Sequence, residues 1–357
     1  MQLTENKYLI FDNPKKVDVK FFIKFMLSFV LTIFYKIKLN LIFPLEKRKL
    51  KYNVSICAIF KNEAKYLREW IEFHKIVGVE HFYLYNNFST DGYLQVLKPY
   101  IDLGIVSLID WPVMQGQMSA YKNCVERFQN ESQWIGFVDI DEFICPNSFD
   151  KIEDFLEQFK KRPIVIIYWK YFGSSGIFKR NENSLVTESF FSCWEKYADI
   201  GKCFYNTSYD YASDLKGNEW MHYRWGKYKN HKLPPVNVFN KICILGFNPV
   251  KTDKMPIQIN HYVVKSLNEY KEKSKKGDAC FNKNGHNMSY FYEHERKSQF
   301  SDFHIIRYLA ELKLNIEVCI LEPHRLRHLN ETLVAGVLFY EETEELVGNH
   351  DKTGTVR

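Results

Sequence analysis

The stretch that decides the fold begins with Val54–Phe60, which reads VSICAIF. An almost uninterrupted apolar run of this length predicts a strand that is buried on both faces of a sheet. Helical periodicity follows over Lys65–Val77 and ends at Gly78, a residue type that often terminates helices, and the next strand is predicted at His81–Tyr85. A strand, a helix and a second strand of these lengths predict a right-handed βαβ unit with parallel strands.

The same alternation continues along the chain. Helical patterns cover Tyr93–Tyr100 and Ser119–Phe128, and apolar strand patterns cover Gly104–Ile109, Trp134–Val138 and Pro163–Trp169. We therefore predict an α/β fold with a mostly parallel central sheet flanked by helices. Ligands of such sheets bind at the carboxyl ends of the strands, so the polar residues that follow each strand are the informative ones.

Length and composition fit one enlarged catalytic domain with an addition at each end. The chain has 357 residues, and 46% of them are hydrophobic, which is ample for a core. The net charge of +6 comes from interleaved acidic and basic residues, which argues against nucleic acid as a partner. The 8 cysteines contain no C-x-x-C pair, so dispersed, buried thiols are the simplest interpretation. We predict an N-terminal segment at 1–50, a catalytic domain at 53–300, and a C-terminal helical extension with a polar tail at 301–357.

The second half of the predicted catalytic domain is less regular than the first. Helices are expected at Ser266–Lys276 and Asp302–Leu314. The stretch Ser189–Asn240 is rich in aromatic residues without a clear period, and we interpret it as an irregular surface that faces an acceptor.

The segment Phe21–Phe43 is apolar but interrupted by lysines, and its longest uncharged run, Phe25–Tyr35, is too short to cross a bilayer as a helix. At helical spacing the surface is apolar except for one polar stripe, which consists of Lys20, Lys24, Ser28, Thr32, Lys36 and Asn40. We predict a basic amphipathic helix that lies on a membrane surface, at the cytoplasmic face of the inner membrane. The alternatives are a helix packed on the catalytic domain and a single-pass anchor.

The strongest local signal is Trp134–Phe143, which reads WIGFVDIDEF. Alternate residues at the end of a strand point the same way, so Asp139 and Asp141 are expected to converge on one cation. Two hard carboxylate ligands suit Mn²⁺ or Mg²⁺ and leave positions for phosphate oxygens and water. Such a cation neutralises a leaving diphosphate, which the chemistry of a nucleotide sugar requires. A D-x-D is common by chance, and its place directly after a predicted buried strand gives it weight.

Three further motifs stand at the ends of predicted elements. Lys61-Asn62-Glu63 follows the first strand and Tyr85–Gly92 follows the second, where amide and carboxylate groups can read a base and a ribose. Each motif also offers an N-cap residue to the next helix, Asn62 and Asp91, and the two roles are compatible. The third motif surrounds His261, whose neutral imidazole could complete a metal site, although a lone histidine is more often only hydrogen-bonded.

Together these motifs resemble glycosyltransferase family 92 and its bacterial relatives, which are related to family 2. The matching features occur in family order between residues 53 and 280. They are Lys61–Glu63, Tyr66–Trp70, His74, Gly78-Val79, Tyr85–Gly92, Asp139–Phe143, Phe172–Gly176, His261-Tyr262, Lys265-Ser266, Glu269-Tyr270 and Lys273. The resemblance implies a GT-A type fold, a nucleotide-diphospho-sugar donor such as a UDP-sugar, and Mn²⁺ or Mg²⁺.

The resemblance also implies roles for individual residues. Asp139 and Asp141 would bind the metal and the diphosphate, and His261 would be a later ligand. Residues around the nucleotide and the donor sugar or phosphate would be Lys61, Asn62, Glu63, Asn86, Asp91, Lys122 and Asn123. The stretch Trp169–Gly176 would line the acceptor side.

The family is expected to invert the anomeric centre by direct displacement, which needs one general base near the acceptor hydroxyl. Glu188, Asp210 and Asp214 are the candidates for this base, and the sequence does not choose between them. The stretch Ser192–Arg224 departs from the family pattern, so the acceptor is the least determined part of the prediction.

We therefore expect a metal-dependent glycosyltransferase of the hexosyltransferase class that acts on a glycan or lipid-linked acceptor, in the biosynthesis of a bacterial surface polysaccharide such as lipopolysaccharide or capsule. One alternative is a nucleotidyltransferase, against which the lack of a Gly-rich loop after Phe60 argues. Another is a catalytically silent module that binds a glycan or a nucleotide.

Overall fold

The computed structural model describes residues 6–10, 18–44, 48–211, 222–276 and 287–321. The chain divides into two units, residues 1–312 and 313–357, and the first contains all the strands of the described ranges. Helix α10 (Leu309–Leu321) crosses the boundary between the units. The boundary falls inside the C-terminal extension expected from residue 301, and the division into three parts stays a prediction.

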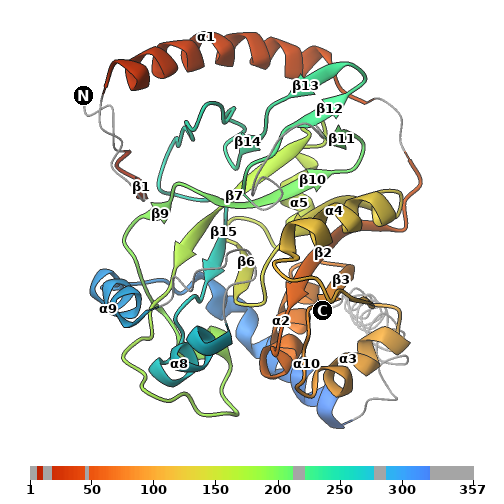
Figure 1. Cartoon of the computed structure of the whole chain (residues 1–357), viewed down its shortest axis with the longest axis vertical. Helices are drawn as coiled ribbons and strands as arrows, with labels where there is room; N and C mark the ends of the chain where they lie inside the picture. The colour runs from red at the N-terminus through yellow and green to blue at the C-terminus, as the bar shows by residue number, and fades with distance from the viewer. Residues whose placement is uncertain (1–5, 11–17, 45–47, 212–221, 277–286, 322–357) are drawn as a thin grey trace, which may run out of the picture. The chain divides into compact units, whose positions relative to one another are not determined.

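The α/β fold with a mostly parallel central sheet, expected from the sequence, is confirmed, and one half of this sheet is parallel throughout (Figure 1). The parallel strands are β2 (Tyr52–Phe60), β3 (His81–Asn86), β4 (Val106–Asp110) and β5 (Ser132–Phe137), each within two residues of its predicted bounds. They lie in the order β4-β3-β2-β5. The order reverses at β2, and the crevice beyond the carboxyl ends of β2 and β5 is where such sheets bind ligands.

The other half of the sheet is mixed and continues in the order β10-β7-β15-β6. Strand β10 (Gly201–Asn206) runs antiparallel to both β5 and β7 (Ile164–Tyr171). Strand β15 (Ile257–His261) is parallel to β7 and antiparallel to β6 (Glu142–Pro146). The interpretation of the stretch around β10 as irregular was wrong, because a lysine at the second position of this strand breaks the apolar run by which buried strands are found.

Helices cover both faces of the parallel half. On one face, Tyr121 and Cys124 of α4 (Gln117–Phe128) pack in one cluster with Tyr83 of β3. On the other face, Trp70 contacts Phe82 with ring centroids 5.4 Å apart. Phe82 and Tyr83 are consecutive residues of one strand, so their side chains point to opposite faces. The helix that carries Trp70 and helix α4 therefore lie on opposite sides of the sheet.

Trp70 belongs to α2 (Ala64–Ile76), which packs beside α3 (Tyr93–Asp102). Gly78 follows α2 with a φ of 97°, a conformation that favours glycine, and the predicted end of this helix is confirmed. Helix α8 (Leu267–Lys276) also agrees with its prediction. The helix expected over Asp302–Leu314 is split into a short 3₁₀ turn, η1 (His304–Tyr308), and α10.

Most of the remaining elements are short. They are β1 (Leu9–Ile10), α1 (Val19–Leu41), α5 (Ile152–Glu157), α6 (Val186–Ser189), β8 (Ser192–Cys193), β9 (Tyr197–Ala198), β11 (Asp210–Tyr211), β12 (Gly226–Tyr228), β13 (His231–Leu233), β14 (Val236–Asn237), α9 (Met288–Lys297) and β16 (Phe300–Ser301). Strands β11, β12 and β13 form a separate three-stranded sheet. The cysteines whose side chains are described are buried and free, as expected.

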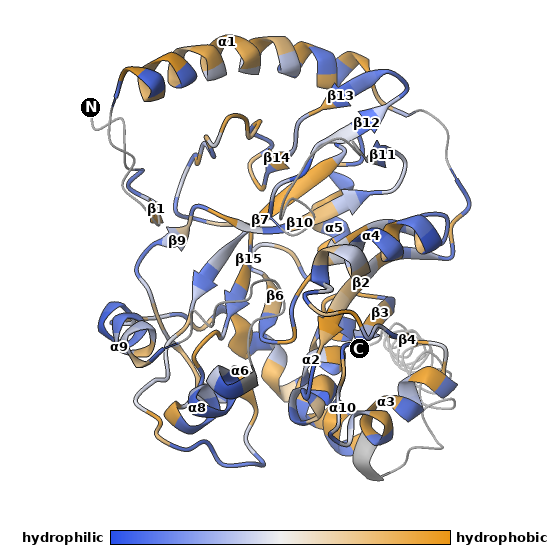
Figure 2. Cartoon of the chain, viewed as in Figure 1, coloured by the Kyte–Doolittle hydropathy of each residue, from blue (hydrophilic) through white to orange (hydrophobic). Residues whose placement is uncertain are grey.

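The N-terminal segment forms α1, whose first turn is capped by Asp18 through the amide of Phe21 (2.7 Å). The polar stripe of this helix is only partly exposed, since Ser28 is buried and Thr32 half-buried. Their hydroxyls donate to carbonyl groups of the same helix (2.7 Å each), so their burial leaves no hydroxyl proton unpaired. None of the described helices combines the length and apolar character needed to cross a bilayer. Figure 2 shows hydrophobic residues along much of α1, with hydrophilic ones between them.

We expect Gly201→Ala to lower the free energy of unfolding by at least about 2 kcal/mol. A Cβ atom at Gly201 would lie 1.7 Å from the carbonyl oxygen of Ile167 in β7, so the ladder between β7 and β10 would have to open. Urea unfolding measures this change. Gly92→Ala is the control, because its Cβ would meet only the end of the Gln95 side chain at 3.4 Å. Equal stability of the two variants would contradict the close pairing of β7 and β10.

Candidate active site

The D-x-D motif lies in a tight turn that follows β5. The Glu142 amide donates to the Asp139 carbonyl (3.1 Å), and the Asp139 amide donates to Glu142 Oε2 (3.1 Å). The indole nitrogen of Trp70 donates to the carbonyl oxygens of Asp139 (3.0 Å) and Glu142 (2.9 Å), which holds both ends of the turn. Because β5 ends at Phe137, Asp139 and Asp141 are not alternate residues of a strand, and the expected geometric reason for their convergence does not hold.

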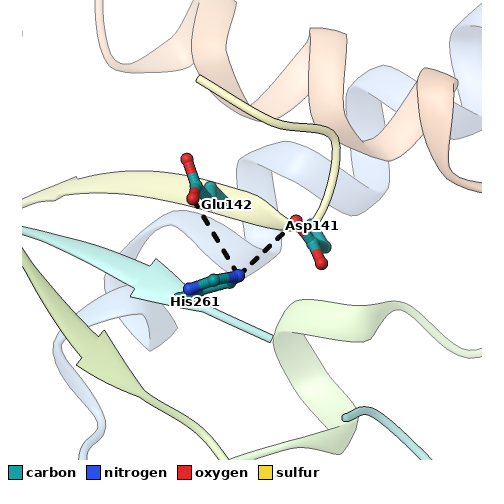
Figure 3. Close-up of side chains that lie close together, drawn as sticks. All are labelled: Asp141, Glu142 and His261. Atoms are coloured by element: carbon teal, nitrogen blue, oxygen red, sulfur yellow. Dashed lines mark ion pairs between the residues drawn. The ribbon is translucent and has the colours of Figure 1, made fainter. Parts of the chain in front are cut away.

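Asp141, Glu142 and His261 form a group that could hold a metal ion, with one ligand atom of each within 4.8 Å of the others. His261 Nε2 lies 3.7 Å from Asp141 Oδ1 and 3.9 Å from Glu142 Oε1, as Figure 3 shows. The β6–β15 ladder pairs His261 directly with Glu142, and the amide of Tyr262 donates to the Asp141 carbonyl (2.9 Å). Backbone pairing therefore fixes the three side chains beside one another.

The chemistry of this group fits a hard divalent cation such as Mn²⁺ or Mg²⁺. Glu142 Oε1 is buried and accepts no hydrogen bond, with Lys202 Nζ 3.5 Å away, so a cation would satisfy its unused acceptor capacity. Burial lowers the pKa of His261, which leaves the imidazole neutral and able to bind a metal through a ring nitrogen. Two carboxylates and one imidazole leave further positions for phosphate oxygens.

Asp139 lies outside this group. Its Oδ1 accepts hydrogen bonds from Gln117 (2.9 Å) and Tyr121 (3.1 Å), and its Oδ2 accepts one from Lys202 Nζ (2.8 Å). The structure thus brings together Asp141 and His261 of the three expected metal ligands and adds Glu142. A metal-binding role for Asp139 stays a prediction.

Two buried lysines and the half-buried Lys273 neutralise the acidic residues of the site. Lys202 is fully buried, and its Nζ lies 2.8 Å from Asp139 and 3.5 Å from Glu142. Lys273 donates a hydrogen bond to Asp141 Oδ2. Lys265 is also buried, with its Nζ 4.4 Å from the centre of the Tyr66 ring, where the ammonium group is stabilised by a cation–π contact. The formal charges of three carboxylates and three lysines cancel.

These neighbours shift the pKa values of the site. Burial would raise the pKa of Asp141, but Lys273 and then His261 hold it well below its ordinary range. Burial raises the pKa of Glu142 well above its ordinary value, Lys202 opposes this, and the nearby aspartates add to it. Burial would lower the pKa of Lys202, but Asp139 and Glu142 outweigh it and raise that pKa. Asp141 and Lys202 are therefore charged at neutral pH.

The loops that follow β2 and β3 are joined by hydrogen bonds at the same edge of the sheet. The amide of Asn62 donates to Ser89 Oγ (3.0 Å), and the amide of Thr90 donates to Asn62 Oδ1 (2.7 Å). Asp91 Oδ2 accepts the amide of Ala64 at the start of α2 (2.8 Å). Asp91 therefore caps α2 and not α3 as expected, since the hydrogen-bonded loops bring it to the neighbouring helix. Its Oδ1 is buried without a hydrogen-bond partner.

The other residues expected near the donor have varied surroundings. Lys61 is exposed, and Glu63 is the half-buried N-cap residue of α2, although its side chain makes no capping hydrogen bond. Asn86 is buried and donates to Tyr93 and Asp110 (2.9 Å each).

The two residues expected on α4 also have protein partners. Lys122 pairs with Glu126 on the exposed side of the helix (2.6 Å), and Asn123 Oδ1 accepts a hydrogen bond from Tyr85 (2.9 Å). Contact of these residues with a donor stays a prediction.

The three candidates for the general base lie in different surroundings. Glu188 is half-buried in α6, where its Oε1 accepts the amide of Leu185 (2.8 Å) and caps that helix. Asp210 is exposed in β11, opposite Lys227 of β12 in the separate three-stranded sheet. Asp214 lies outside the described residues. The identity of the base stays open.

Aromatic residues of β7 pack against the metal-binding group. Trp169 and Tyr171 lie with ring centroids 4.8 Å and 5.5 Å from the His261 imidazole. The indole nitrogen of Trp169 is buried without a hydrogen-bond partner. These two aromatic side chains hold the imidazole in place. They belong to the stretch Trp169–Gly176, which is expected to line the acceptor side.

Sequence reasoning did not assign roles to Glu142, Lys202, Lys265 and Lys273. Glu142 stands next to the D-x-D motif, but the expectation that alternate strand residues converge does not include it. Lys202 carries a signal of its own, since a single lysine in the apolar and aromatic strand Gly201–Asn206 must be paired with an acid if it is buried. The two other lysines were noted as part of a family pattern without a function.

Comparison with known proteins decides the family. The family model "Glycosyltransferase family 92" matches residues 51–316. This chain belongs to glycosyltransferase family 92. The resemblance seen in the sequence is thereby confirmed, and the motifs that carried it lie inside the matched residues.

The curated relatives agree with this family. A glycosyltransferase family 92 protein of Oryza sativa subsp. japonica is 32% identical over 119 residues, which are 33% of this chain and 20% of the rice protein. The beta-1,4-galactosyltransferase galt-1 of Caenorhabditis elegans is 33% identical over 109 residues, or 27% of this chain and 26% of that protein. The matches span only 16% to 26% of the curated relatives' own lengths.

Among solved structures, TarS residues 1–349 of S. aureus in complex with UDP resembles 52% of this chain over 60% of its own length. The sequence identity is 16% and the TM-score 0.33, a likeness too low to carry an argument about this family 92 protein.

We expect Glu269→Gln to remove part of the acid sensitivity of folding. Glu269 is mostly buried and binds Arg180 (2.8 Å), Tyr66 (2.9 Å) and Ser266 (2.6 Å), which ties α8 and its Lys273 to the loop after β7. Burial would raise the pKa of Glu269, but Arg180 and Ser266 outweigh it and lower the pKa to about 2.

A lowered pKa contributes stability above the ordinary value of 4.5, and this stability is lost as the pH falls from there toward 2. Between about pH 5 and pH 3, urea unfolding should therefore show the wild type losing about 2 kcal/mol more than Glu269→Gln. Parallel pH profiles for the two proteins would contradict the ion pair.

Proposed function

We propose that this family 92 protein transfers a hexose from a nucleotide-diphospho-sugar to a hydroxyl group of a glycan, with a divalent cation bound by Asp141, Glu142 and His261. One observation carries the proposal: two carboxylates and a neutral imidazole lie within 4.8 Å of one another at the carboxyl edge of the sheet. Membership of family 92 gives this geometry its chemical context. Asp139, held by Lys202, would then position the turn that carries Asp141.

The charge balance of the site supports a diphosphate as ligand. The formal charges of Asp139, Asp141 and Glu142 cancel those of Lys202, Lys265 and Lys273, so a bound divalent cation leaves an excess of +2. A bound cation neutralises the charge that develops on the leaving diphosphate. Lys273 and Lys265, which flank Asp141, would hold the phosphate oxygens, and the low dielectric of a buried site strengthens these contacts.

The loops after β2 and β3 would bind the nucleotide. The hydrogen bonds between Asn62, Ser89 and Thr90 hold these loops together before a ligand arrives, which reduces the entropy cost of binding. Asp91 Oδ1 is a buried acceptor without a partner, and an N–H of a base or an O–H of a ribose would satisfy it. Lys61, Glu63 and Asn86 stand at the ends of the same two strands.

UDP-galactose is the donor that we propose to test first. Support comes from the beta-1,4-galactosyltransferase among the relatives, which shares 33% of its residues over the matched stretch. Direct displacement on an α-linked nucleotide sugar inverts the anomeric centre and gives a β-linkage, the linkage that the name of the nematode galactosyltransferase states. The general base would be a carboxylate such as Glu188, Asp210 or Asp214.

For the acceptor we propose a class of molecule, a glycan or a lipid-linked glycan. The expected role in lipopolysaccharide or capsule biosynthesis finds no support in the relatives, which come from plants and a nematode. Family membership also gives no support to the alternative of a nucleotidyltransferase.

We expect Asp141→Asn and Glu142→Gln to reduce Mn²⁺-dependent release of UDP from UDP-galactose at least about 100-fold, because each change removes a negatively charged metal ligand. Release of UDP is measured with and without Mn²⁺, and binding of Mn²⁺ is measured separately by isothermal titration calorimetry. Asp102→Asn is the matched control, since this exposed carboxylate pairs with Lys98 on α3, and it should keep wild-type activity.

The outcomes separate the proposal from its alternative. Wild-type turnover in Asp141→Asn would contradict the metal site. Binding of Mn²⁺ and UDP-galactose without release of UDP, on any acceptor supplied, would favour the catalytically silent binding module.

A further inference from the structure

Helix α1 has an inner face that packs on the rest of its unit. Phe21 and Leu39 are buried, and Phe21 and Phe25 meet the ring of Phe247 with centroids 5.6 Å and 5.7 Å apart. Arg162 donates to the carbonyl oxygen of Leu39 (3.1 Å) and to Asn40 Oδ1 (3.0 Å), which ties down the end of the helix. These contacts of the inner face are the ones that the alternative of a helix packed on the catalytic domain requires.

The outer face of α1 is apolar and exposed. Its large hydrophobic side chains are between 46% and 77% exposed, and they are Val19, Phe22, Ile23, Met26, Leu27, Phe29, Val30, Ile33, Phe34, Ile37 and Leu41. At 3.6 residues per turn these positions lie on the side of the helix opposite Phe21, Ser28 and Leu39. A continuous exposed apolar surface of this length marks an interaction site, because water solvates it poorly.

Positive charge borders this apolar face. The sequence of α1 contains no acidic residue, and Lys20, Lys24 and Lys36 are exposed on it. At its C-terminal end, Lys38 Nζ donates to the carbonyl oxygen of Lys232 in the β12–β13 hairpin (3.0 Å).

The hairpin itself adds to this charge. Lys227, Lys229 and Lys232 are exposed on β12, β13 and the turn between them, beside the end of α1 (Figure 1). The apolar face of α1 and the lysines of the helix and hairpin together are called the α1 surface below.

We propose that the α1 surface binds a membrane rich in anionic lipid, with the helix lying in the plane of the interface. The 23 residues of α1 span about 34 Å, and none of the described helices is suited to cross a bilayer. An in-plane helix inserts its apolar side chains below the headgroups, while lysines at its border reach the lipid phosphates. The cytoplasmic leaflet of the inner membrane is an anionic surface of this kind.

Charge distinguishes this occupant from a second copy of the chain. Two copies packed through their α1 surfaces would bring lysines of both helices together, and like charges oppose such a contact. Anionic headgroups complement the same lysines. Because the inner face of α1 is packed on the first unit, membrane binding would also hold the candidate active site in one orientation to the lipid surface.

The test uses the full chain and flotation with vesicles of phosphatidylcholine alone or mixed with phosphatidylglycerol. We expect binding to the anionic vesicles to be at least about 10-fold stronger than to the neutral ones. The double variant Phe29→Ser with Ile33→Ser should lose at least about 10-fold in binding to anionic vesicles, since two inserted side chains are removed. Lys20→Gln with Lys24→Gln should weaken anionic binding and leave the weak neutral binding unchanged.

A matched control replaces two exposed apolar residues outside α1, Leu94→Ser with Phe178→Ser, and should bind like the wild type. All substituted positions are exposed, so the midpoint temperature of thermal unfolding should change little. Measuring this temperature checks that the variants fold. Equal vesicle binding by the Phe29 and Ile33 variant and the wild type would overturn the proposal. A dimer in solution that this variant abolishes, without vesicle binding by the wild type, would overturn it in favour of a second copy.

Discussion

The antiparallel register of β6 and β15 is the constraint on which the candidate site depends. It pairs Glu142 with His261 and leaves Asp141 and Tyr262 at the next position, joined by a backbone hydrogen bond of 2.9 Å. A slip of one residue would turn His261 to the other face of the sheet, and the group would lose its nitrogen ligand. Trp70 holds the turn on one side of this ladder, and the aromatic residues of β7 pack against the imidazole on the other. Secondary structure thus positions the ligands before any cation binds.

Buried lysines make this concentration of acidic groups compatible with folding. Three carboxylates in one small volume repel one another and lose hydration, and each effect favours their protonated forms. Lys202 and Lys273 oppose this by direct contact with Asp139 and Asp141. Because a buried charge without its partner is strongly destabilising, the positions of these lysines are fixed as firmly as those of the acids. The same lysines offset the charge of the acids, which suits a cation and a diphosphate that bind together.

Much of the fold could be predicted because its signals are local. Strands β2 to β5 and helices α2 to α4 follow apolar runs and helical periods that a few neighbouring residues define, and Gly78 ends α2 through its own backbone freedom. Strand β10 was not predicted because Lys202 interrupts its apolar pattern. The partner of that lysine, Asp139, lies 63 residues away in the chain. The sequence predicts one polar stripe on α1 but not its burial, and Ser28 and Thr32 of this stripe bond to their own helix and are buried and half-buried.

The sequence by itself determined the α/β class, indicated the carboxyl edge of the sheet as the place of the candidate site, and singled out Asp139, Asp141 and His261 as candidate metal ligands. Those features depend on side-chain types and short spacings, which a linear sequence displays directly. Only the tertiary structure decided that Glu142 joins Asp141 and His261 in the candidate metal site while Asp139 turns to Lys202. It also decided which face of α1 is covered. The physical reason is that strand register and long-range packing bring together residues more than 100 positions apart, such as Glu142 and His261, and no local pattern encodes which of them meet.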